Sequence, residues 1–335
     1  MDRDGKSTRA IALLSGGLDS TLAVKLILEQ GIKVEALNFV TPFCHCNRPG
    51  RCEAVRVSEQ FGIPCKVIAV TDEFLEVIRH PRYGYGRGMN PCLDCRILMF
   101  SKARRRMEKT GADFVFTGEV LGERPMSQRR DAMRIIERDS GLDGRLLRPL
   151  CAKLLPPTIP EQQGLVDRGK LLAISGRSRR PQMALAKEYG IVDYPCPAGG
   201  CLLTDPGFAR RMKDLVQHCP DFGLNDVSLL KVGRLFRLSP TVKAVVGRNE
   251  GENQRIVALV RPGDLFFEVK GWGSPVTLLR GEASAEEIRL AAALTVRYSD
   301  APGRVAVEYG ADYDALSEMV ETAPLSESAL QELRI

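Results

Sequence analysis

The sequence predicts an α/β protein, with a doubly wound parallel sheet over residues 1–220 and a smaller α+β domain over residues 221–335. Two observations predict this class. Short apolar runs alternate with helical patterns through the first part of the chain, whereas strand-like runs follow one another from about residue 224. Strands that alternate with helices form parallel sheets covered on both faces, and ligands bind at the carboxyl ends of their strands.

The first strand and helix give the clearest pattern. The run "AIALL" has the length of a strand, and Leu18, Leu22 and Leu26 then recur every four residues until Gly31. This spacing predicts a helix that buries one stripe. Further strands are expected at "KVEALNFV", "PCKVIAV", "ADFVFTGE" and "KLLAISGR", with a helix over about 53–61. In the second domain we expect strands at "VKAVVGR", "DLFFEVKG" and "PVTLLRG" and a helix at "SAEEIRLAAALTVRYS".

Composition narrows the class of protein. The chain has 335 residues, of which 44% are hydrophobic, enough for two domains with their own cores. No apolar run approaches the length of a membrane span, and the polar N-terminus lacks the apolar stretch of a signal peptide, so we expect a cytoplasmic protein. Ten cysteines in a cytoplasmic chain favour thiols, metal ligands or catalysts over structural disulfides.

Charge is spread unevenly along the chain. The formal net charge is +6, but from Glu308 onward there are seven acidic residues and one arginine, so this acidic tail carries −6 and the rest +12. Four basic clusters lie in the remainder, "KARRR", "QRRDAMR", "GRSRR" and "ARRMK". A solvated helix face explains any one of them, whereas four together predict a polyanionic partner.

The segment "SGGLDS" at residues 15–20 ends the first strand and opens the first helix. Its glycines permit a tight turn, and N–H groups at a helix start can hold an anion. The segment resembles the PP-loop of the adenine nucleotide α-hydrolase superfamily, whose pattern is SGGxDS; a plain glycine turn would not explain the Ser-Asp-Ser frame. The resemblance implies that ATP is cleaved between its α and β phosphates, with Mg²⁺ offsetting their charge and Asp19 catalytic. It also implies an ATP-binding set: Ser15, Gly16, Gly17, Asp19, Ser20, Asn38, Phe39, Thr117 and Gly118.

Three cysteines indicate which group attacks the substrate once ATP has adenylated it. "NPCLDC" carries Cys92 and Cys95 just before an amphipathic helix, and resembles the segment around the first catalytic cysteine of bacterial tRNA 2-thiouridylases, which implies that role for Cys95. "YPCPAGGCLLTDP" resembles the segment with the essential cysteine of tRNA 4-thiouridine synthetases, which implies that role for Cys201. The three are also arranged as in thiolation enzymes that hold a [4Fe-4S] cluster with an open iron.

Alternatives to the cluster stay open. A persulfide–disulfide mechanism would use the same thiols, and a zinc site would take Cys196 as a fourth ligand. Because Cys196 and Cys201 are close in sequence, Cys196 is also an alternative third ligand of the cluster. "FCHCNRPGRC" adds Cys44, Cys46 and Cys52, spaced tightly enough for a second metal site, a sulfur relay or plain loop thiols.

Two regions predict contact with RNA. Arg129 and Arg130 lie between the fourth and fifth expected strands, beside the nucleotide crevice, where basic side chains suit phosphates. "KVGRLFRLSPTVKAVVGRNEGENQRI" resembles the RNA-binding domain of NFACT-type proteins, which implies RNA contacts in the second domain. The residues implied there are Arg234, Arg237, Arg248 and Asn249. The alternative is a module that serves only to pack or to dimerise, and in the second case the protein would be a homodimer.

Together the resemblances predict a tRNA uridine thiolation enzyme that uses ATP and takes its sulfur from outside. Cysteine desulfurases, sulfur carriers and free sulfide are the possible donors, since no rhodanese-like loop is recognisable. One alternative is a PP-loop ligase that inserts nitrogen or acts on a small molecule. Another is a non-catalytic, zinc-bound RNA-binding protein. The segments do not distinguish thiolation at position 2 of uridine from thiolation at position 4.

Overall fold

A computed structural model describes residues 7–44, 52–191, 194 and 200–335 of the chain. It divides into two compact units, residues 1–204 and 205–335. The division lies before the helix at 206–218, and thus earlier than the boundary expected after residue 220. Among the described residues, none of the helices combines the length and apolar character that a membrane crossing requires.

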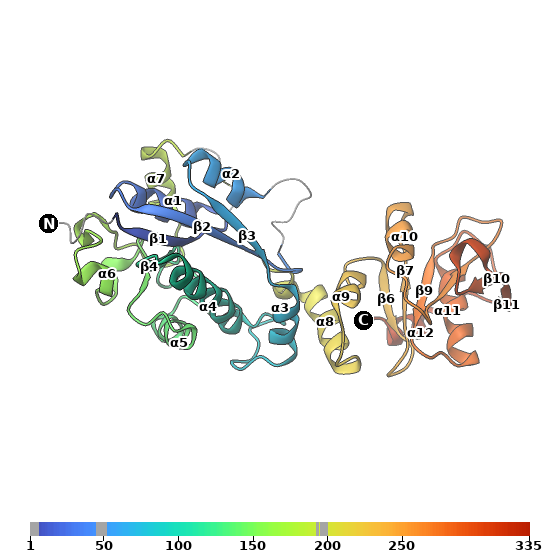
Figure 1. The fold of residues 1–335 in the computed structure, drawn as a ribbon. Helices are drawn as coiled ribbons and strands as arrows, with labels where there is room; N and C mark the ends of the chain where they lie inside the picture. Colours follow the sequence, from blue (N-terminus) through green and yellow to red (C-terminus); the bar gives the residue numbers. More distant parts are fainter. Residues whose placement is uncertain (1–6, 45–51, 192–193, 195–199) are drawn as a thin grey trace. The chain divides into compact units, whose positions relative to one another are not determined.

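A five-stranded sheet forms the centre of the first unit, with strand order β3-β2-β1-β4-β5 (Figure 1). All neighbouring strands are parallel, so the predicted doubly wound class is confirmed. The order reverses between β1 and β4, and such reversals create a crevice at the carboxyl ends of the strands. The strands are β1 (Arg9–Leu13), β2 (Lys33–Val40), β3 (Cys65–Ala69), β4 (Phe114–Thr117) and β5 (Leu146–Leu147).

Helices cover both faces of this sheet (Figure 1). One face buries its apolar side chains against α1, α2 and α7, and the other against α4 and α5. The helices are α1 (Leu18–Leu28), α2 (Glu53–Gln60), α3 (Thr71–Arg79), α4 (Cys92–Thr110), α5 (Arg130–Ser140), α6 (Ile159–Gln162) and α7 (Arg180–Glu188). The helix stripe predicted from Leu18 is correct: Leu18, Leu22 and Leu26 are all buried.

The strand expected at "KLLAISGR" is wrong. The fifth strand is instead Leu146–Leu147, and the expected segment keeps only an isolated bridge between Ser175 and Leu121. Its backbone does run beside the chain that follows β5, since Leu172 N–H donates to the Pro149 carbonyl at 2.9 Å. Pro149 has no N–H to return, so a regular ladder cannot continue there.

The second unit is built on a six-stranded antiparallel sheet, with strand order β11-β10-β8-β9-β7-β6. Helix α11 packs on the sheet where the sequence predicts a helix, and a capping box at Ser284 starts it. The strands are β6 (Arg234–Arg237), β7 (Lys243–Val246), β8 (Leu265–Glu268), β9 (Thr277–Arg280), β10 (Val305–Gly310) and β11 (Glu318–Thr322). The helices are α8 (Pro206–His218), α9 (Leu224–Leu229), α10 (Glu250–Val257), α11 (Ala285–Arg297) and α12 (Glu327–Leu333).

The acidic C-terminal stretch is folded, and is not the tail that its charge suggests. It contributes the second half of β10 and all of β11 and α12. Val307 of β10 and Leu330 of α12 are buried in the core of the unit. Apolar side chains at these positions anchor the segment, while its acidic residues after Glu308 are exposed.

Candidate active site

The PP-loop residues lie immediately after β1, and close packing on two sides fixes their backbone. Gly16 has φ +79°, and a Cβ at this position would lie 2.6 Å from the backbone of Glu53 in α2. Ser20 Oγ donates to the Gly17 carbonyl at 2.8 Å. The first bond of the helix runs from Thr21 N–H to the Gly17 carbonyl at 3.0 Å. The N–H groups before Thr21 therefore stand outside the helical ladder, where they can hold an anion.

Residues from two neighbouring strands meet this loop. Asn38 Nδ2 donates to the Leu14 carbonyl at 2.9 Å, which ties the end of β2 to the start of the loop. Thr117 pairs with Leu13 in the sheet. Gly118 is so close to α1 that a Cβ there would lie 2.4 Å from the Asp19 backbone. The structure thus gathers most of the expected ATP-binding residues at one edge of the sheet, while the Phe39 side chain packs against the core on the α4 face.

Helix α4 begins at Cys92, so Cys92 and Cys95 both lie in its first turn. The sequence placed this pair just before the helix; the helix extends further because Pro91, with its fixed φ, serves as the N-cap residue. The chain leaves the last turn of α4 and enters β4, so the first turn lies at the carboxyl edge of the sheet. That edge is also where the PP-loop follows β1.

Segments distant in the sequence meet these cysteines. Met89 N–H donates to the Leu203 carbonyl at 3.0 Å, which joins the chain before α4 to the segment that carries Cys201. Cys201 forms an isolated antiparallel bridge with Cys44, which follows β2. The four cysteines Cys44, Cys92, Cys95 and Cys201 are called the thiol group below; all are partly exposed.

The sequence leaves Cys44, Cys46 and Cys52 open as a second metal site, a sulfur relay or loop thiols, and the structure places Cys44 beside Cys201 in the thiol group. Cys52 caps the start of α2, where its Sγ lies 3.7 Å from Asn38 Oδ1. The reason is the backbone bridge, which holds Cys44 against Cys201 across the fold. Cys46 and Cys196 lie outside the described residues.

Burial governs the electrostatics of the thiol group. It raises the pKa of Cys95 to about 12, and the nearby Cys201, Cys92 and Cys44 add to the rise while Arg96 opposes it. Burial also raises the pKa of Cys201 to about 11, again with help from Cys44 and Cys92. Both thiols are therefore protonated at neutral pH, and a metal centre bound there would have to displace their protons. Within the described ranges, no three His, Cys, Asp or Glu side chains converge closely enough to hold a single metal ion.

An ion-pair chain connects the thiol group with the PP-loop. Arg96, which follows Cys95, lies 3.5 Å from the Glu119 carboxylate, and Glu119 follows Gly118. Arg148 donates to the same carboxylate at 3.1 Å and also pairs with Glu137. Glu119 and Arg148 are almost completely buried. Sequence reasoning missed both, although an arginine within the apolar run "LLRPL" is a signal that a buried acidic partner exists.

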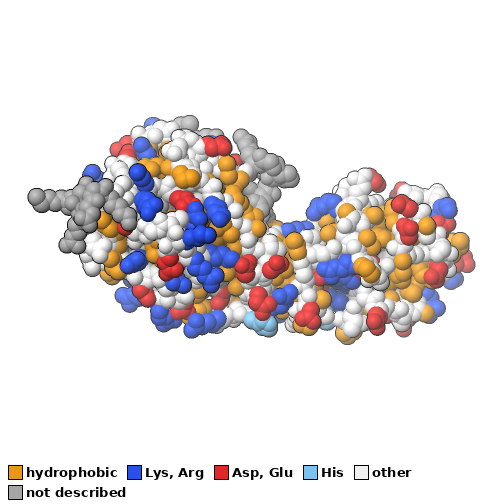
Figure 2. Space-filling model, viewed as in Figure 1, with side chains coloured by type: hydrophobic (Ala, Val, Ile, Leu, Met, Phe, Trp, Pro, Cys, Tyr) orange, Lys and Arg blue, Asp and Glu red, His pale blue; other side chains and the backbone are white. Residues whose placement is uncertain are grey.

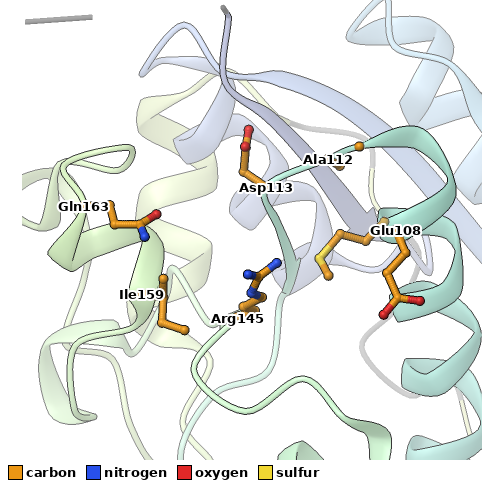
Figure 3. Close-up of a pocket in the computed structure, with 8 residues that line it drawn as sticks. Glu108, Ala112, Asp113, Arg145, Ile159 and Gln163 are labelled. Atoms are coloured by element: carbon orange, nitrogen blue, oxygen red, sulfur yellow. The ribbon is translucent and has the colours of Figure 1, made fainter. Parts of the chain in front are cut away.

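Two cavities in the described part of the first unit lie at the other edge of the sheet. One has a volume of about 380 Å³ and is lined by residues that precede β4 and β5, including Asp113 and Arg145 (Figure 3). Ile159 and Gln163, from α6 and the residue after it, close its second side (Figure 3). Because these residues precede the strands, the cavity is remote from the PP-loop and the thiol group.

The residues expected to contact RNA differ in whether their side chains already have partners within the protein. Arg129 and Arg130 are exposed at the start of α5, and Figure 2 shows Lys and Arg side chains gathered on the face formed by α4 and α5. In the second unit, four residues already have partners within the unit. Arg234 lies 4.4 Å from the centre of the Tyr298 ring, Arg237 Nη2 lies 2.5 Å from Asp214, Arg248 pairs with Glu252, and the Asn249 side chain caps α10.

Two family models match separate parts of the chain. Residues 5–153 match the family model described as thiamine biosynthesis protein (ThiI), and residues 233–334 match the model of the NFACT protein RNA binding domain. The chain therefore contains one segment similar to the ThiI family and one similar to the NFACT RNA-binding domain. The resemblances stated from "SGGLDS" and from "GRLFR…VGRNEGEN" are confirmed.

Individual relatives match about a third of the chain. The tRNA-specific 2-thiouridylase MnmA of Syntrophotalea carbinolica is 34% identical over 122 residues, 34% of this chain and 35% of the relative. The Deinococcus radiodurans MnmA is 30% identical over 132 residues, 36% of this chain and 35% of the relative. The chain spans about a third of the length of the curated relatives it matches.

Two solved structures align loosely with about two thirds of the chain. A 4-thiouridine synthetase–RNA complex with bound ATP gives a TM-score of 0.38 at 24% identity, covering 64% of this chain and 51% of the other. The U34-tRNA thiolase NcsA from Methanococcus maripaludis, with its [4Fe-4S] cluster, gives 0.31 at 18% identity, covering 69% of this chain and 73% of the other.

Proposed function

We propose that this protein thiolates a uridine in tRNA. ATP, bound with Mg²⁺ at the PP-loop, transfers AMP to a carbonyl oxygen of uracil and leaves pyrophosphate on the loop. Sulfur then replaces AMP at the activated carbon. AMP is a far better leaving group than the original oxygen, so adenylation makes the exchange possible.

The observation that supports this proposal most directly is the common edge shared by the thiol group and the PP-loop. The chain from Cys95 through Arg96 and Glu119 to Gly118 is short, and Gly118 touches the Asp19 backbone. A base adenylated over the loop would therefore lie near the sulfur source. The family match to ThiI and the similarity to 2-thiouridylases support the same chemistry.

For the sulfur source we propose a [4Fe-4S] cluster on Cys92, Cys95 and Cys201. Partly buried thiols are the soft ligands that such clusters take, and each iron binds its own thiolate, so the sulfurs need not meet at one point. A cluster held by three thiolates supplies one iron with a free position for sulfide. Cys44 brings a fourth thiol into the same place, and the persulfide mechanism would use two of these four.

For the RNA partner we propose contacts on both units. In the first unit the exposed Arg129 and Arg130 lie at the start of α5, beside the loop that follows Gly118. Phosphate contacts of this kind position a nucleic acid without reading its sequence. In the second unit the NFACT-type domain supports RNA binding as a whole.

The function is tested by replacing Asp19 or Cys201 with alanine in cells that lack the wild-type gene. We expect each variant to lose thiouridine from bulk tRNA, measured by mass spectrometry of nucleosides, because Asp19 serves adenylation and Cys201 serves sulfur transfer. Cys219→Ser, in the second unit, is the matched control and should keep the wild-type level. Normal thiouridine in the complete absence of the gene would disprove the proposed activity.

A further inference from the structure

Three side chains from distant parts of the first unit surround the acidic residue of the PP-loop. Arg179 precedes α7, and its Nη2 lies 2.5 Å from Asp19 Oδ2. The same nitrogen lies 3.1 Å from Glu123 Oε1, and Arg179 Nε donates to that oxygen at 3.2 Å. The guanidinium therefore lies between two carboxylates. Gln182, one turn further along α7, is completely buried beside them.

Several polar atoms of this cluster are buried without a hydrogen-bond partner. Asp19 Oδ1 and Glu123 Oε2 are buried without a hydrogen bond. The amide oxygen and nitrogen of Gln182 are also buried without a hydrogen bond. Buried polar atoms without partners are costly, and in native structures each one calls for an explanation. A ligand that enters the crevice and binds these atoms would explain why they have no partner within the protein.

The arrangement of charges indicates the charge of that ligand. The Arg179 guanidinium lies within 3.1 Å of carboxylate oxygens of both Asp19 and Glu123, and each carboxylate keeps one buried oxygen without a hydrogen bond. Two neighbouring carboxylates need a cation between them, and without nucleotide that cation is Arg179. Mg²⁺ is bound in nucleotide enzymes by one or two carboxylates together with phosphate oxygens. The free oxygens of Asp19 and Glu123 fit this ion.

We propose that Arg179 leaves the two carboxylates when Mg²⁺-bound ATP enters, and that its guanidinium then binds the pyrophosphate portion. Asp19 and Glu123 remain as carboxylate ligands for the ion. The inference rests on the proposed use of ATP and adds Glu123 and Arg179 to its site. It also explains why "SGGLDS" functions without a lysine: the cation comes from α7, where a planar guanidinium can contact two phosphate oxygens at once.

Calorimetry on the two-domain protein tests this exchange without measuring thiolation. The titrants are ATP with Mg²⁺, ATP with EDTA, pyrophosphate with Mg²⁺, and AMP. We expect Arg179→Gln to weaken binding of Mg²⁺–ATP and of pyrophosphate by about 10- to 100-fold, as expected when a charged hydrogen bond is removed. AMP, which lacks the pyrophosphate, should bind Arg179→Gln as it binds wild type. Arg179→Lys should recover part of the affinity.

Two further variants test the role of Glu123 in binding Mg²⁺ and provide a control for Arg179. Glu123→Gln should reduce the gain in ATP affinity that Mg²⁺ gives to the wild-type protein, because the ion then has one ligand fewer. Arg180→Gln changes an exposed neighbour on the same helix and should bind all titrants as wild type does.

The proposal is overturned if Arg179→Gln binds pyrophosphate normally. It is equally overturned if AMP affinity falls in parallel with ATP affinity, since that pattern indicates a purely structural role. If ATP binds as expected but tRNA contains no thiouridine that depends on the gene, the exchange stands and the proposed function fails.

Discussion

At the scale of single residues, the thiol group decides which sulfur chemistry the site can support. Cys44 and Cys201 face each other across a backbone bridge, while Cys92 and Cys95 share one helical turn. The sequence indicates the second pair, because its members are adjacent. The first pair depends on a contact between segments more than 150 residues apart, which spacing alone does not reveal.

Iron analysis distinguishes the roles of these cysteines. We expect protein purified without oxygen to contain about four irons and four sulfides per chain, as a [4Fe-4S] cluster requires. Cys201→Ser should lose most of that iron, whereas Cys44→Ser should keep it, because three thiolates remain. Equal loss in the two variants would make Cys44 a ligand, and zinc in place of iron would contradict the cluster.

At the scale of elements, the nucleotide site depends on how closely α1 approaches the end of β4. Gly118 allows that approach, since any Cβ there would lie within 2.5 Å of the Asp19 backbone and the Ser20 nitrogen. Backbone atoms cannot move aside as a flexible side chain can. The ends of β1 and β4 therefore determine together where the PP-loop sits.

The variant Gly118→Ala tests this dependence. We expect it to push α1 away from β4, to weaken ATP binding at least 10-fold and to lower the melting temperature by several degrees, as overpacking costs about 1–3 kcal/mol. Calorimetry and thermal melting measure the two effects. Gly62→Ala is a control for replacement of a glycine outside the site, because a Cβ there meets nothing within 4 Å. It should lower stability only through the strain of its positive φ and leave ATP affinity unchanged.

Element prediction succeeded where one short segment carried its own pattern. "KVEALNFV" corresponds to β2 residue by residue, and the stripe from Leu18 is buried as expected. It failed where pairing depended on a distant partner. The segment "KLLAISGR" has the composition of a strand, yet its neighbour contains Pro149, and the two-residue β5 gives no pattern of its own. Arg179 and Glu123 were missed for the same reason, since an arginine in "GRSRR" looks like one of many surface cations.

At the scale of the whole molecule, the distribution of charge determines which surface attracts a polyanionic partner. The +12 of residues 1–307 opposes the −6 of the C-terminal stretch, and the latter is folded into β10, β11 and α12. Figure 2 shows Lys and Arg side chains gathered over α4 and α5. Arg129 and Arg130, at the start of α5, are exposed. A nucleic acid that binds this face releases counterions from its phosphates. The affinity of the protein for the nucleic acid must therefore fall with added salt.

The salt dependence of tRNA binding measures how these arginines engage phosphates. We expect the double variant Arg129→Gln/Arg130→Gln of the two-domain protein to bind tRNA more weakly at low salt. The slope of log Kd against log salt should decrease by about 0.7–0.9 for each phosphate that the variant no longer neutralises. Lys33→Gln, an exposed change at the start of β2 on the opposite edge of the sheet, should keep the wild-type slope. An unchanged slope in the double variant would place the tRNA elsewhere on the protein.

The position of β1 has a consequence for synthesis of the chain. Among the strands of its sheet it is made first, but it ends up in the middle, between β2 and the much later β4. A nascent polypeptide that stops before residue 114 exposes one unpaired side of this apolar strand. Until β4 has left the ribosome, the emerging chain can neither bind nucleotide nor cover this side of β1. Early translation is therefore the period when the chain most needs a chaperone.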